Sequence, residues 1–530
     1  MRIAALDLGS NSFHLVVVEA RLDRTFSTVV REKEVLRLGD LVARTGRIGP
    51  EAAQRALEVL VRFRALSVAH RADELVALGT SALREALDGD EFVERARAEA
   101  GVDIEVVDGV REARLIFSAI RSSVLIEPAP ALAADLGGGS LELMVGDQAE
   151  LAFAASLRLG VGRLTAELVR DDPPSREDLG RIGRRVSSEL APVLAEVAVH
   201  KPRMLIGSSG TFLAIARMAV ARREGTQPET LNQLRVARRD IAALAEVALA
   251  LPSAARARLA GCDARRAELI PAGLVVLDAL MESTGLEELT LSEWALREGI
   301  VLEAIGAHDR ADLANDPRAI RRASLLSLCR RSSWRQPHAR QVAALALELF
   351  DQMGEIHRLG GEDRELLELA ALAHDIGEHV SRTDHDRHGA YLLENGGLRG
   401  FSPAEIQVLS SVVRFHVRGT PKPHHDAFAQ LEEADRLRVA KLVALLRVAD
   451  ALEATHAGTV EHVAVEATRP DAGHCTLVVR AHSDVELELW TLRRKKELFE
   501  RTFGIELRAR VERVGPSGFE PSAAGTSGFG

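Results

Sequence analysis

Cysteine is scarce in this sequence. The chain has 530 residues but only 3 cysteines, Cys262, Cys329 and Cys475, which lie far apart and form no Cys-x-x-Cys pair. A disulfide framework needs many cysteines, and a thiolate zinc site needs closely spaced ones. Both classes are therefore excluded, and we expect the three cysteines to be core residues or to have no role in function.

Long apolar runs are also missing. No segment approaches the roughly 20 apolar residues that a membrane-spanning helix needs. The first residues, MRIAALDLGS, do not have the layout of a signal peptide. With 46% hydrophobic and 28% charged residues, the composition is that of an ordinary soluble protein. We therefore expect a cytoplasmic protein without a transmembrane segment.

The sequence has no excess of positive charge. Its formal net charge is −10 at pH 7, which argues against general nucleic-acid binding, because nucleic-acid-binding domains usually present a basic face. A polyanionic substrate would need a local basic patch instead. The length is too great for one hydrophobic core and predicts three or four domains.

One short pattern occurs twice. The residues from Asp7 to Leu15 are DLGSNSFHL, and those from Asp135 to Leu143 are DLGGGSLEL. Each copy lies between two apolar strands, which predicts a hairpin with a polar tip. A tip of Gly, Ser and Asn lets backbone N–H groups surround an anion, and the Asp can hold the cation that accompanies phosphate. The repeat therefore predicts a phosphate clamp made of two facing half-sites.

The repeated pattern differs from the common phosphate-binding glycine loops. A dinucleotide fingerprint or a P-loop runs from a strand into a helix, whereas both copies here run from a strand into a strand. The two copies also differ from each other, because His14 stands in the first where Glu142 stands in the second. We expect the second hairpin to handle water and metal and the first to hold phosphate.

Hydrophobic periodicity divides the chain into regions. Apolar strands alternate with amphipathic helices up to about residue 305, and helical, histidine-rich periodicity follows to about residue 455. Strand-like alternation returns at 460–465, 475–479 and 485–490, before a helix-like segment at 492–503. The predicted domains are two similar α/β domains at 1–125 and 126–305, an all-α domain at 306–457, a small α+β unit at 458–514 and a disordered tail at 515–530.

Three segments outside the hairpins place polar groups at strand ends. Glu112 lies in the first turn of a helix, where its carboxylate can orient or deprotonate a water aimed at phosphorus. The other reading is a first-turn glutamate that the helix dipole stabilises and that has no catalytic role. Arg84 follows another strand and is suited to forked contact with phosphate, although a solvated helix residue is equally compatible with the sequence. Residues 207–211, GSSGT, lead from a strand into a helix and offer N–H groups to a further phosphate.

Together these segments resemble the exopolyphosphatase and guanosine pentaphosphate phosphohydrolase family, within the actin and hexokinase fold group. The resemblance covers about residues 1–510. It implies an α/β fold with two actin-like (ribonuclease H-like) domains, followed by an all-α HD-like domain and the small α+β unit. One departure is Arg111, where relatives commonly carry a glutamate. The stretches that carry the resemblance are DLGSNSFHLVV at 7–17, GTSALREA at 79–86, GVREARLIF at 109–117, DLGGGSLELMVG at 135–146, RLGVGRLT at 158–165, GSSGT at 207–211 and LSEWALREGI at 291–300.

The resemblance also implies roles for individual residues. Glu112 is the expected catalytic glutamate. Asp135 and Glu142 are expected to support the metal or the attacking water, and Asp7 is expected to support the cation, Mg²⁺, from the opposite hairpin. The expected phosphate-binding residues are Ser10, Asn11, Arg84, Gly138, Gly139, Ser140, Ser209, Gly210 and Thr211.

The helical region resembles the metal site of HD phosphohydrolases. His338, the pair His374-Asp375, and Asp450 occur in the order of that pattern. Imidazoles and carboxylates in this number suit a divalent cation with open positions for a phosphate ester. The other reading is a helical scaffold without catalysis. Candidate ligands for a second metal are His385, His388 and His416.

These observations lead to an expected function. We expect a Mg²⁺-dependent, homodimeric hydrolase of phosphoric anhydrides that removes terminal phosphate processively from inorganic polyphosphate by metal-assisted attack of water. The alternatives are hydrolysis of guanosine pentaphosphate (pppGpp), or an HD-domain phosphohydrolase or regulatory protein whose α/β half senses phosphate. A kinase of the same fold would activate a hydroxyl instead of water, and the context of Glu112 favours hydrolysis. A filament-forming relative would have no counterpart of the helical region.

Overall fold

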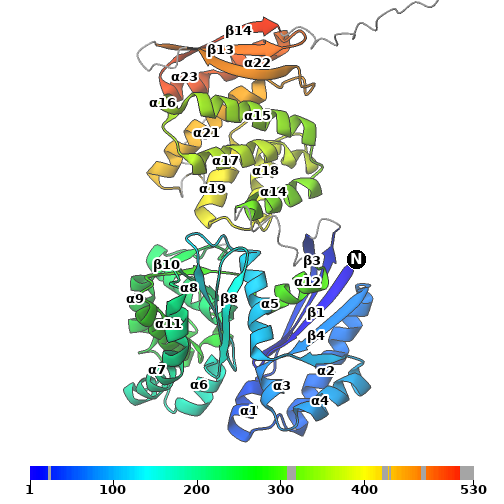
Figure 1. Cartoon of the computed structure of the whole chain (residues 1–530), viewed down its shortest axis with the longest axis vertical. Helices are drawn as coiled ribbons and strands as arrows, with labels where there is room; N and C mark the ends of the chain where they lie inside the picture. The colour runs from blue at the N-terminus through cyan, green and yellow to red at the C-terminus, as the bar shows by residue number, and fades with distance from the viewer. Residues whose placement is uncertain are drawn as a thin grey trace, which may run out of the picture. The chain divides into compact units, whose positions relative to one another are not determined.

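The computed structural model describes residues 1–21, 25–228, 230–306, 318–419, 428, 431–466 and 473–513, so the predicted tail at 515–530 lies outside the described residues. The chain forms two compact units (Figure 1). Among the described residues, no helix is both long and apolar enough to cross a membrane. The first unit is Met1–Arg321 with Arg399–Pro403, and the second is Arg322–Leu398 with Ala404–Gly530.

The first unit begins with a five-stranded sheet in the order β3-β2-β1-β4-β5. β1 and β2 form an antiparallel hairpin, β3 pairs antiparallel with β2, and β4 and β5 are parallel to β1. The strands are β1 (Arg2–Leu8), β2 (Ser12–Ala20), β3 (Phe26–Val35), β4 (Glu74–Gly79) and β5 (Ile104–Val106). The helices are α1 (Leu38–Thr45), α2 (Pro50–Ala69), α3 (Ser81–Glu85), α4 (Gly89–Arg95), the π-helix η1 (Ala96–Ala100) and α5 (Gly109–Arg121).

A six-stranded sheet follows in the order β10-β11-β9-β6-β7-β8. Its strands are β6 (Ala131–Leu136), β7 (Leu141–Gly146), β8 (Leu151–Leu157), β9 (Met204–Ser208), β10 (Arg235–Ala237) and β11 (Glu288–Leu291). The helices of this part are α6 (Val161–Leu168), α7 (Arg176–Val199), α8 (Ser209–Glu224), α9 (Arg238–Ala248), α10 (Ser253–Arg256), the 3₁₀-helix η2 (Ala264–Arg266), α11 (Ile270–Thr284) and α12 (Leu296–Ala304).

The two sheets repeat one arrangement. β1 pairs antiparallel with β2 and parallel with β4, and β6 pairs antiparallel with β7 and parallel with β9. Within the hairpins, Asp7 lies opposite His14, and Asp135 lies opposite Glu142. The predicted α/β class and the repeated hairpin are therefore confirmed, and the inequality of the two copies places a histidine and a glutamate at equivalent positions.

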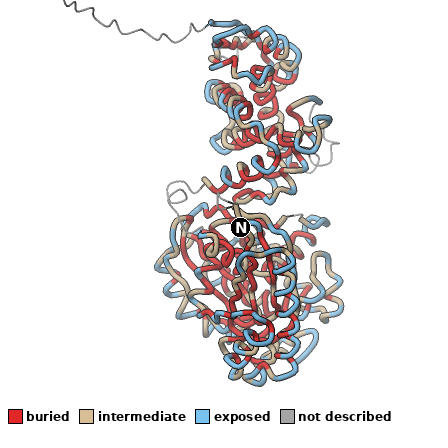
Figure 2. The backbone as a smooth tube through the Cα atoms, turned by 90° about the vertical axis from the view of Figure 1, so that its right-hand side faces the viewer, coloured by how far each residue is buried: buried red, intermediate tan, exposed pale blue. Residues whose placement is uncertain are grey.

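The central strands are buried on both faces, and alternate residues enter different cores. Leu132 and Ala134 of β6 pack in a core with α8 and α11, whereas Ala131 and Ala133 pack in a core with α5 and α12. Ile3 of β1 belongs to that same α5 and α12 core. Figure 2 shows buried backbone running through the interior of the molecule. Successive side chains of a strand point to opposite faces, so each central strand contributes to two cores. The core that β1 and β6 share packs the two sheets against each other.

The second unit is helical at first and ends in a three-stranded sheet in the order β12-β13-β14. The change from α/β to helical periodicity was expected from the sequence. The helices are α14 (Ala319–Arg331), whose first turn belongs to the first unit, α15 (Gln336–Gln352), α16 (Gly354–His357), α17 (Gly361–Ala373), η3 (Ile376–His379), α18 (His385–Asn395), α19 (Pro403–Arg414) and α21 (Glu433–Ala451). The closing elements are β12 (Val460–Glu466), β13 (His474–Ala481), α22 (Glu486–Lys495), α23 (Glu497–Phe503) and β14 (Glu506–Arg513).

The strand predicted at 485–490 is wrong, because this segment leads into helix α22. Val485, Glu488 and Leu492 are buried while Leu487 is exposed. Spacings of three and four residues define one face of a helix, and they outweigh the short run of alternating residues. The third strand is β14, which pairs parallel with β13.

Candidate functional site

The tips of the two hairpins lie against each other. A Cβ atom placed on Gly139 would be 2.5 Å from Ser10 Oγ, and one on Gly138 would be 3.0 Å from Asn11 Cβ. Ser10 Oγ also accepts a hydrogen bond of 3.1 Å from the backbone N–H of Ala82, at the start of α3. The two predicted half-sites therefore face each other, and glycine allows them to approach this closely.

The carbonyl groups of the second tip point toward α6. The backbone N–H groups of Val161 and Arg163 donate to the carbonyl oxygens of Gly137 and Gly138, at 3.0 and 3.1 Å. The Arg163 side chain donates through Nε to the carbonyl of Gly139 at 3.2 Å. The N–H and C=O of one trans peptide point in opposite directions, so the N–H groups that follow these carbonyls point away from α6. The tip therefore presents consecutive backbone donors that suit a phosphate oxygen.

The first tip is held in the same way. The Ser10 carbonyl accepts a hydrogen bond of 2.8 Å from the N–H of Gly39, and the Asn11 carbonyl accepts bonds of 3.0 and 2.9 Å from Leu36 and Arg37. The chain after β3 thus supports the first tip as α6 supports the second. Hydrogen bonds within the protein thus hold both tips in place, and such preorganisation lowers the entropy cost of binding an anion.

Four carboxylates lie at the base of the tips. Asp7 and Asp135 are the penultimate residues of β1 and β6, Glu142 lies in β7, and Glu112 lies in the first turn of α5. Glu112 and Glu142 are only 6% and 1% exposed. Buried carboxylates this close to one another disfavour full ionisation.

The pKa values of the four carboxylates are raised. Burial raises the pKa of Asp7 and of Asp135 to about 6 each, and the negative charge of Asp135 adds to the shift of Asp7. Burial and then the Asp135 charge raise the pKa of Glu142 to about 7. Burial and then the Glu142 charge raise the pKa of Glu112 well above its ordinary value. Strongly shifted carboxylates in one cluster are typical of catalytic sites.

Glu112 is positioned by its helix terminus and by one arginine. Asp108 caps α5 by accepting a hydrogen bond of 2.8 Å from the N–H of Arg111, which fixes the first turn. Arg84 Nη1 lies 3.3 Å from Glu112 Oε2 and also donates to the Val107 carbonyl at 2.6 Å. The two residues that the sequence placed at separate strand ends thus meet in one ion pair.

The carboxylates of Asp7, Asp135 and Glu142 suit a divalent cation. Asp135 accepts a hydrogen bond from Ser208 Oγ, and Glu142 Oε1 accepts one of 2.8 Å from Ser156 Oγ. Within the described ranges none of the three carboxylates has an ion pair, although all three are desolvated. Mg²⁺ prefers oxygen donors of this kind and typically takes only one or two carboxylates beside water and phosphate oxygens.

The predicted turn at 207–211 leads from β9 into α8, as expected. Ser209 has a φ of +84°, which a residue with a side chain rarely adopts. Its Oγ accepts a hydrogen bond of 3.3 Å from the N–H of Thr211. A Cβ atom on Gly210 would overlap the guanidinium of Arg266, so that side chain lies directly on the turn. Backbone strain of this kind is concentrated at ligand-binding segments.

Three basic residues of this region were missed by the sequence analysis: Lys33, Arg266 and Arg297. Arg297 Nη1 lies 2.9 Å from His14 Nδ1, and His14 Nε2 lies 2.8 Å from Ser12 Oγ. Since arginine can only donate, Nδ1 is the acceptor and Nε2 carries the proton. Arg297 falls in the stretch LSEWALREGI at 291–300, which carries the family resemblance, but that resemblance assigned it no role. Lys33 and Arg266 fall in none of the stretches that carry it. Lys33 reaches this region because β3 pairs with β2, where it lies opposite His14.

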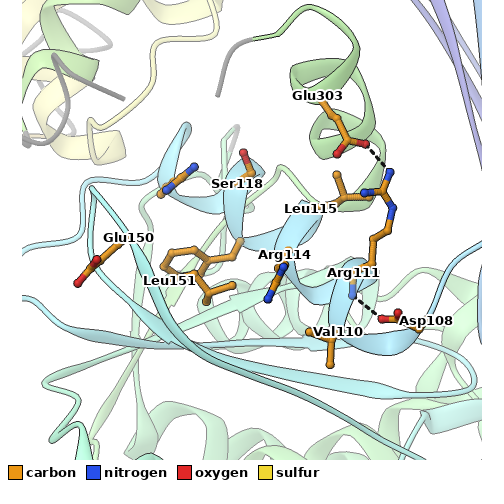
Figure 3. Close-up of a pocket in the computed structure, with 11 residues that line it drawn as sticks. Asp108, Val110, Arg111, Arg114, Leu115, Ser118, Glu150, Leu151 and Glu303 are labelled. Atoms are coloured by element: carbon orange, nitrogen blue, oxygen red, sulfur yellow. Dashed lines mark hydrogen bonds and ion pairs between the residues drawn. The ribbon is translucent and has the colours of Figure 1, made fainter. Parts of the chain in front are cut away.

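Arg111, which departs from the family pattern, points away from the carboxylates. It lies 3.0 Å from Glu303 in α12 and lines a cavity of about 720 Å³ on the outer side of α5. Figure 3 shows Arg111 paired with Glu303 beside Leu115 and Arg114. None of the four clustered carboxylates lines this cavity. The substitution therefore changes the charge behind the helix rather than inside the site.

The histidines and aspartates predicted for the helical unit lie together. His338 in α15, His374 at the end of α17 and Asp450 in α21 can offer ligand atoms within 4.8 Å of one another. His338 Nε2 is 3.2 Å from His374 Nε2 and 3.6 Å from Asp375 Oδ2, and His374 Nε2 is 3.9 Å from Asp450 Oδ1. All clusters of three potential metal ligands found among the described residues belong to this unit.

Further histidines surround Asp375. Its Oδ1 lies 3.3 Å from His385 Nε2 and 3.5 Å from His416 Nε2. Burial acts to raise the pKa of Asp375, but the charge of His374 and the hydrogen bonds of His385 and His416 hold that pKa well below its ordinary value. His456, for which the sequence gave no reason to expect a role, stacks on His338 with ring centroids 3.7 Å apart. No contact between His388 and this cluster is found in the part of the chain that the structure describes. An ionised carboxylate within a ring of imidazoles suits a transition metal.

One cation already touches the cluster. The Nζ of Lys495, from α22, donates to Asp450 Oδ2. The Nδ1 of His338 is buried and has no hydrogen-bond partner. This nitrogen lies 3.9 Å from Glu453 Oε1, whereas Nε2 is the ring nitrogen that faces the cluster. The imidazole and carboxylate atoms that meet there are of the kinds that bind a divalent metal.

Comparison with known proteins identifies related chains. A model described as the Ppx/GppA phosphatase family matches residues 16–308, and one described as Ppx/GppA phosphatase, domain III, matches residues 320–496. Exopolyphosphatase 1 of Mycobacterium leprae is 35% identical over 306 residues, which are 58% of this chain and 90% of that protein. Exopolyphosphatase 1 of Mycobacterium tuberculosis is 33% identical over 306 residues, which cover 58% and 88% of the two chains.

Solved structures agree with these relatives. The crystal structure of an exopolyphosphatase from Cytophaga hutchinsonii has 30% sequence identity and a TM-score of 0.55, covering 58% of this chain and 98% of that chain. The Aquifex aeolicus member of the Ppx/GppA family has 26% identity and a TM-score of 0.50, covering 58% and 99% of the two chains.

Proposed function

Because this chain belongs to the Ppx/GppA phosphatase family, we propose that it is an exopolyphosphatase that releases terminal phosphate from inorganic polyphosphate by attack of water. The observation that carries the proposal is the juxtaposition of Glu112 and Arg84 with two rigid tips of backbone N–H donors. Phosphoryl transfer depends on positioning and charge stabilisation, and this arrangement provides both. Phosphate release by the Glu112→Gln and Gly160→Ala variants tests it.

In the proposed mechanism, the N–H groups of the two tips bind the oxygens of the terminal phosphate. Arg84 balances the charge that develops on them. Glu112, whose pKa burial and Glu142 raise, accepts a proton from the attacking water. The hydroxyl groups of Ser10 and Ser140 complete the set of donors. We propose that Asn11, Ser209, Gly210 and Thr211 bind phosphate as well.

We propose Mg²⁺ as the cofactor of this site, held by Asp7, Asp135 and Glu142. When bound, the cation neutralises phosphate charge and can acidify a bound water. Ser208 and Ser156 orient two of these carboxylates through the hydrogen bonds described above. Hydroxyl donors of this kind keep carboxylate oxygens aimed at a cation.

The alternative substrate is pppGpp, because the family that this chain resembles includes guanosine pentaphosphate phosphohydrolases. Parallel assays of phosphate release from long-chain polyphosphate and from pppGpp distinguish the two. We also propose a cytoplasmic homodimer, which the resemblance implies, and sedimentation of the purified full chain tests the dimer.

Arg84→Met is expected to lower kcat/KM for polyphosphate by about 10- to 100-fold, because a charge-assisted contact to phosphate is lost and the charge of Glu112 is left unbalanced. Steady-state phosphate release measures the change. The matched control is Arg64→Met, on the exposed side of α2, which should behave as wild type. Equal effects of the two substitutions would contradict the role of Arg84.

For the helical unit we propose a second divalent-metal site made of His338, His374, Asp375 and Asp450. The close approach of their ligand atoms supports it. A hydrolytic activity of its own, or a regulatory role with the α/β half as a phosphate sensor, is the second candidate function. Loss of all turnover on changing only these residues would assign the catalysis to this unit.

Replacing His374 and Asp375 together by alanine is expected to remove the metal that the full chain retains after dialysis against Mn²⁺ or Zn²⁺. Two ligands of a four-ligand set are lost, so the site cannot close around the ion. Elemental analysis of the dialysed protein measures the metal. His482→Ala is the control because His482 is half exposed and lies outside the cluster. Retention of the same metal content by the double variant would refute the site.

A further inference from the structure

Lys33, Arg266 and Arg297 form a group of cations with little compensating charge. Arg297 contacts the neutral His14, and the nearest carboxylate oxygen to Arg266 is Asp263 Oδ2, 3.8 Å from Nε. The side chain of Lys33 has neither an ion pair nor a hydrogen bond within the described ranges. Among the described residues, Asp263 is therefore the one carboxylate within ion-pair distance of these three side chains. Basic side chains that outnumber their carboxylate partners are typical of sites for anions.

These cations are built into the site rather than scattered on the surface. Lys33 lies on β3 opposite His14 in the strand register, and Arg297 lies in the first turn of α12. The side chain of Arg266 is only 18% exposed and packs on Gly210 at the start of α8. Three segments far apart in the sequence thus bring positive charge to one edge of the hairpin tips.

The cations affect one another electrostatically. Burial, and then the charges of Arg266 and Arg265, lower the pKa of Lys33 to about 8. Burial also lowers the pKa of Arg266, with further contributions from Arg265 and Arg297. An arrangement that depresses the pKa of its own basic groups is unfavourable without an anion, and a bound polyanion would remove the repulsion.

The group acts on different carboxylates from those that Arg84 balances. Burial raises the pKa of Asp135, and the charges of Arg297 and Arg266 oppose that rise. Asp135 lies beside Ser208 in the parallel pairing of β6 and β9. Arg84 instead forms its ion pair with Glu112. Two separate sets of positive charge therefore serve the two ends of one site.

We propose that Lys33, Arg266 and Arg297 form a subsite for the phosphates that follow the terminal one, while the terminal phosphate is held near Glu112 and Arg84. This inference rests on the proposed function and gives the bound chain a direction. The leaving part of the substrate lies on the cationic subsite when the anhydride bond breaks. The chemistry recognised is a run of at least two phosphates joined to the terminal phosphate, whether it continues as polyphosphate or ends in a nucleoside.

The direct test is binding of tripolyphosphate and of orthophosphate by titration calorimetry at fixed free Mg²⁺, using the Glu112→Gln full chain. Adding Lys33→Met or Arg266→Met is expected to weaken tripolyphosphate binding by about tenfold each, because each removes one cation from the subsite. Orthophosphate binding should change less than twofold. Lys33→Arg should restore most of the tripolyphosphate affinity.

Arg239→Met is the matched control, because Arg239 lies in α9, its side chain is 86% exposed and its carboxylate neighbour is Asp240, 3.8 Å away. It should leave tripolyphosphate binding within about twofold of the parent. Unchanged tripolyphosphate affinity in both Met variants, or an equal loss for orthophosphate, would overturn the subsite. Guanosine triphosphate serves as a third ligand. If the Met variants lose as much affinity for guanosine triphosphate as for tripolyphosphate, the subsite binds the phosphates that the two ligands share. If their affinity for guanosine triphosphate is unchanged, the subsite has no role with nucleotides.

Failure of the subsite and failure of the proposed function give different results. If the Glu112→Gln chain still releases phosphate from tripolyphosphate, the proposed catalytic role is refuted, whatever the Met variants do. If Glu112→Gln is inactive but the Met variants bind tripolyphosphate normally, only the subsite, and with it the direction of the bound phosphate chain, is refuted. Thermal unfolding of each variant, measured in parallel, verifies that the Met substitutions leave the fold intact.

Discussion

Glu112→Gln is expected to lower the rate of phosphate release from long-chain polyphosphate by about 100- to 10,000-fold, the range typical of a lost general base. Glutamine keeps the shape of the side chain but cannot accept the proton of the attacking water. Because the substitution also removes a buried charge next to Glu142, the melting temperature should stay the same or rise. Steady-state phosphate release and thermal unfolding measure the two effects.

The matched control for this prediction is Glu105→Gln. Glu105 lies on β5, a few residues before Glu112, and is an exposed carboxylate 3.2 Å from Arg111. Its substitution should leave the rate within about twofold of wild type, since surface ion pairs contribute little. A Glu112→Gln enzyme as fast as the Glu105→Gln enzyme would show that another group activates the water.

Gly160→Ala is expected to lower kcat/KM by about 100-fold or more, the magnitude reported for loss of a backbone or side-chain donor in a preorganised anion site. A methyl group at this position would overlap the backbone of Gly138 and Gly139. The φ of Gly160 is −63°, which alanine adopts easily, so the effect comes from displacement of the tip rather than from strain at residue 160 itself. Steady-state kinetics with polyphosphate measure it.

Gly183→Ala provides the control for steric specificity. Gly183 lies within α7, and a Cβ atom there would meet no atom within 4 Å. Alanine favours a helix interior over glycine, so this variant should be as active as wild type and at least as stable. Should Gly160→Ala keep full activity, the support of the second tip by α6 would have no functional importance.

The sequence predicted the fold well where a pattern was local and repeated. The two copies of Asp-Leu-Gly predicted two hairpins, and the structure pairs Asp7 with His14 and Asp135 with Glu142. The segment at 485–490 was mispredicted because six residues fit both an alternating and a helical pattern. Tertiary burial of one helical face decides between the two, and a single sequence does not contain that information.

The candidate site was predictable only in part for the same reason. Residues inside a recognisable motif, such as Glu112 and Arg84, were identified, although their ion pair depends on tertiary structure. Lys33, Arg266 and Arg297 lie in three segments whose proximity only the fold creates. Long-range electrostatic neighbours of this kind leave no periodic signal in the sequence.

The division of β6 between two cores has a consequence for changes in chain length. Ala131 and Ala133 face one core and Leu132 and Ala134 the other, and Asp135 follows directly. Inserting or deleting one residue within the strand would exchange the two faces and move the carboxylate out of register with Glu142. The number of residues in β6 therefore fixes the position of Asp135 relative to the two cores and to Glu142. Length changes can be accommodated only in the connections, such as the turn between β7 and β8.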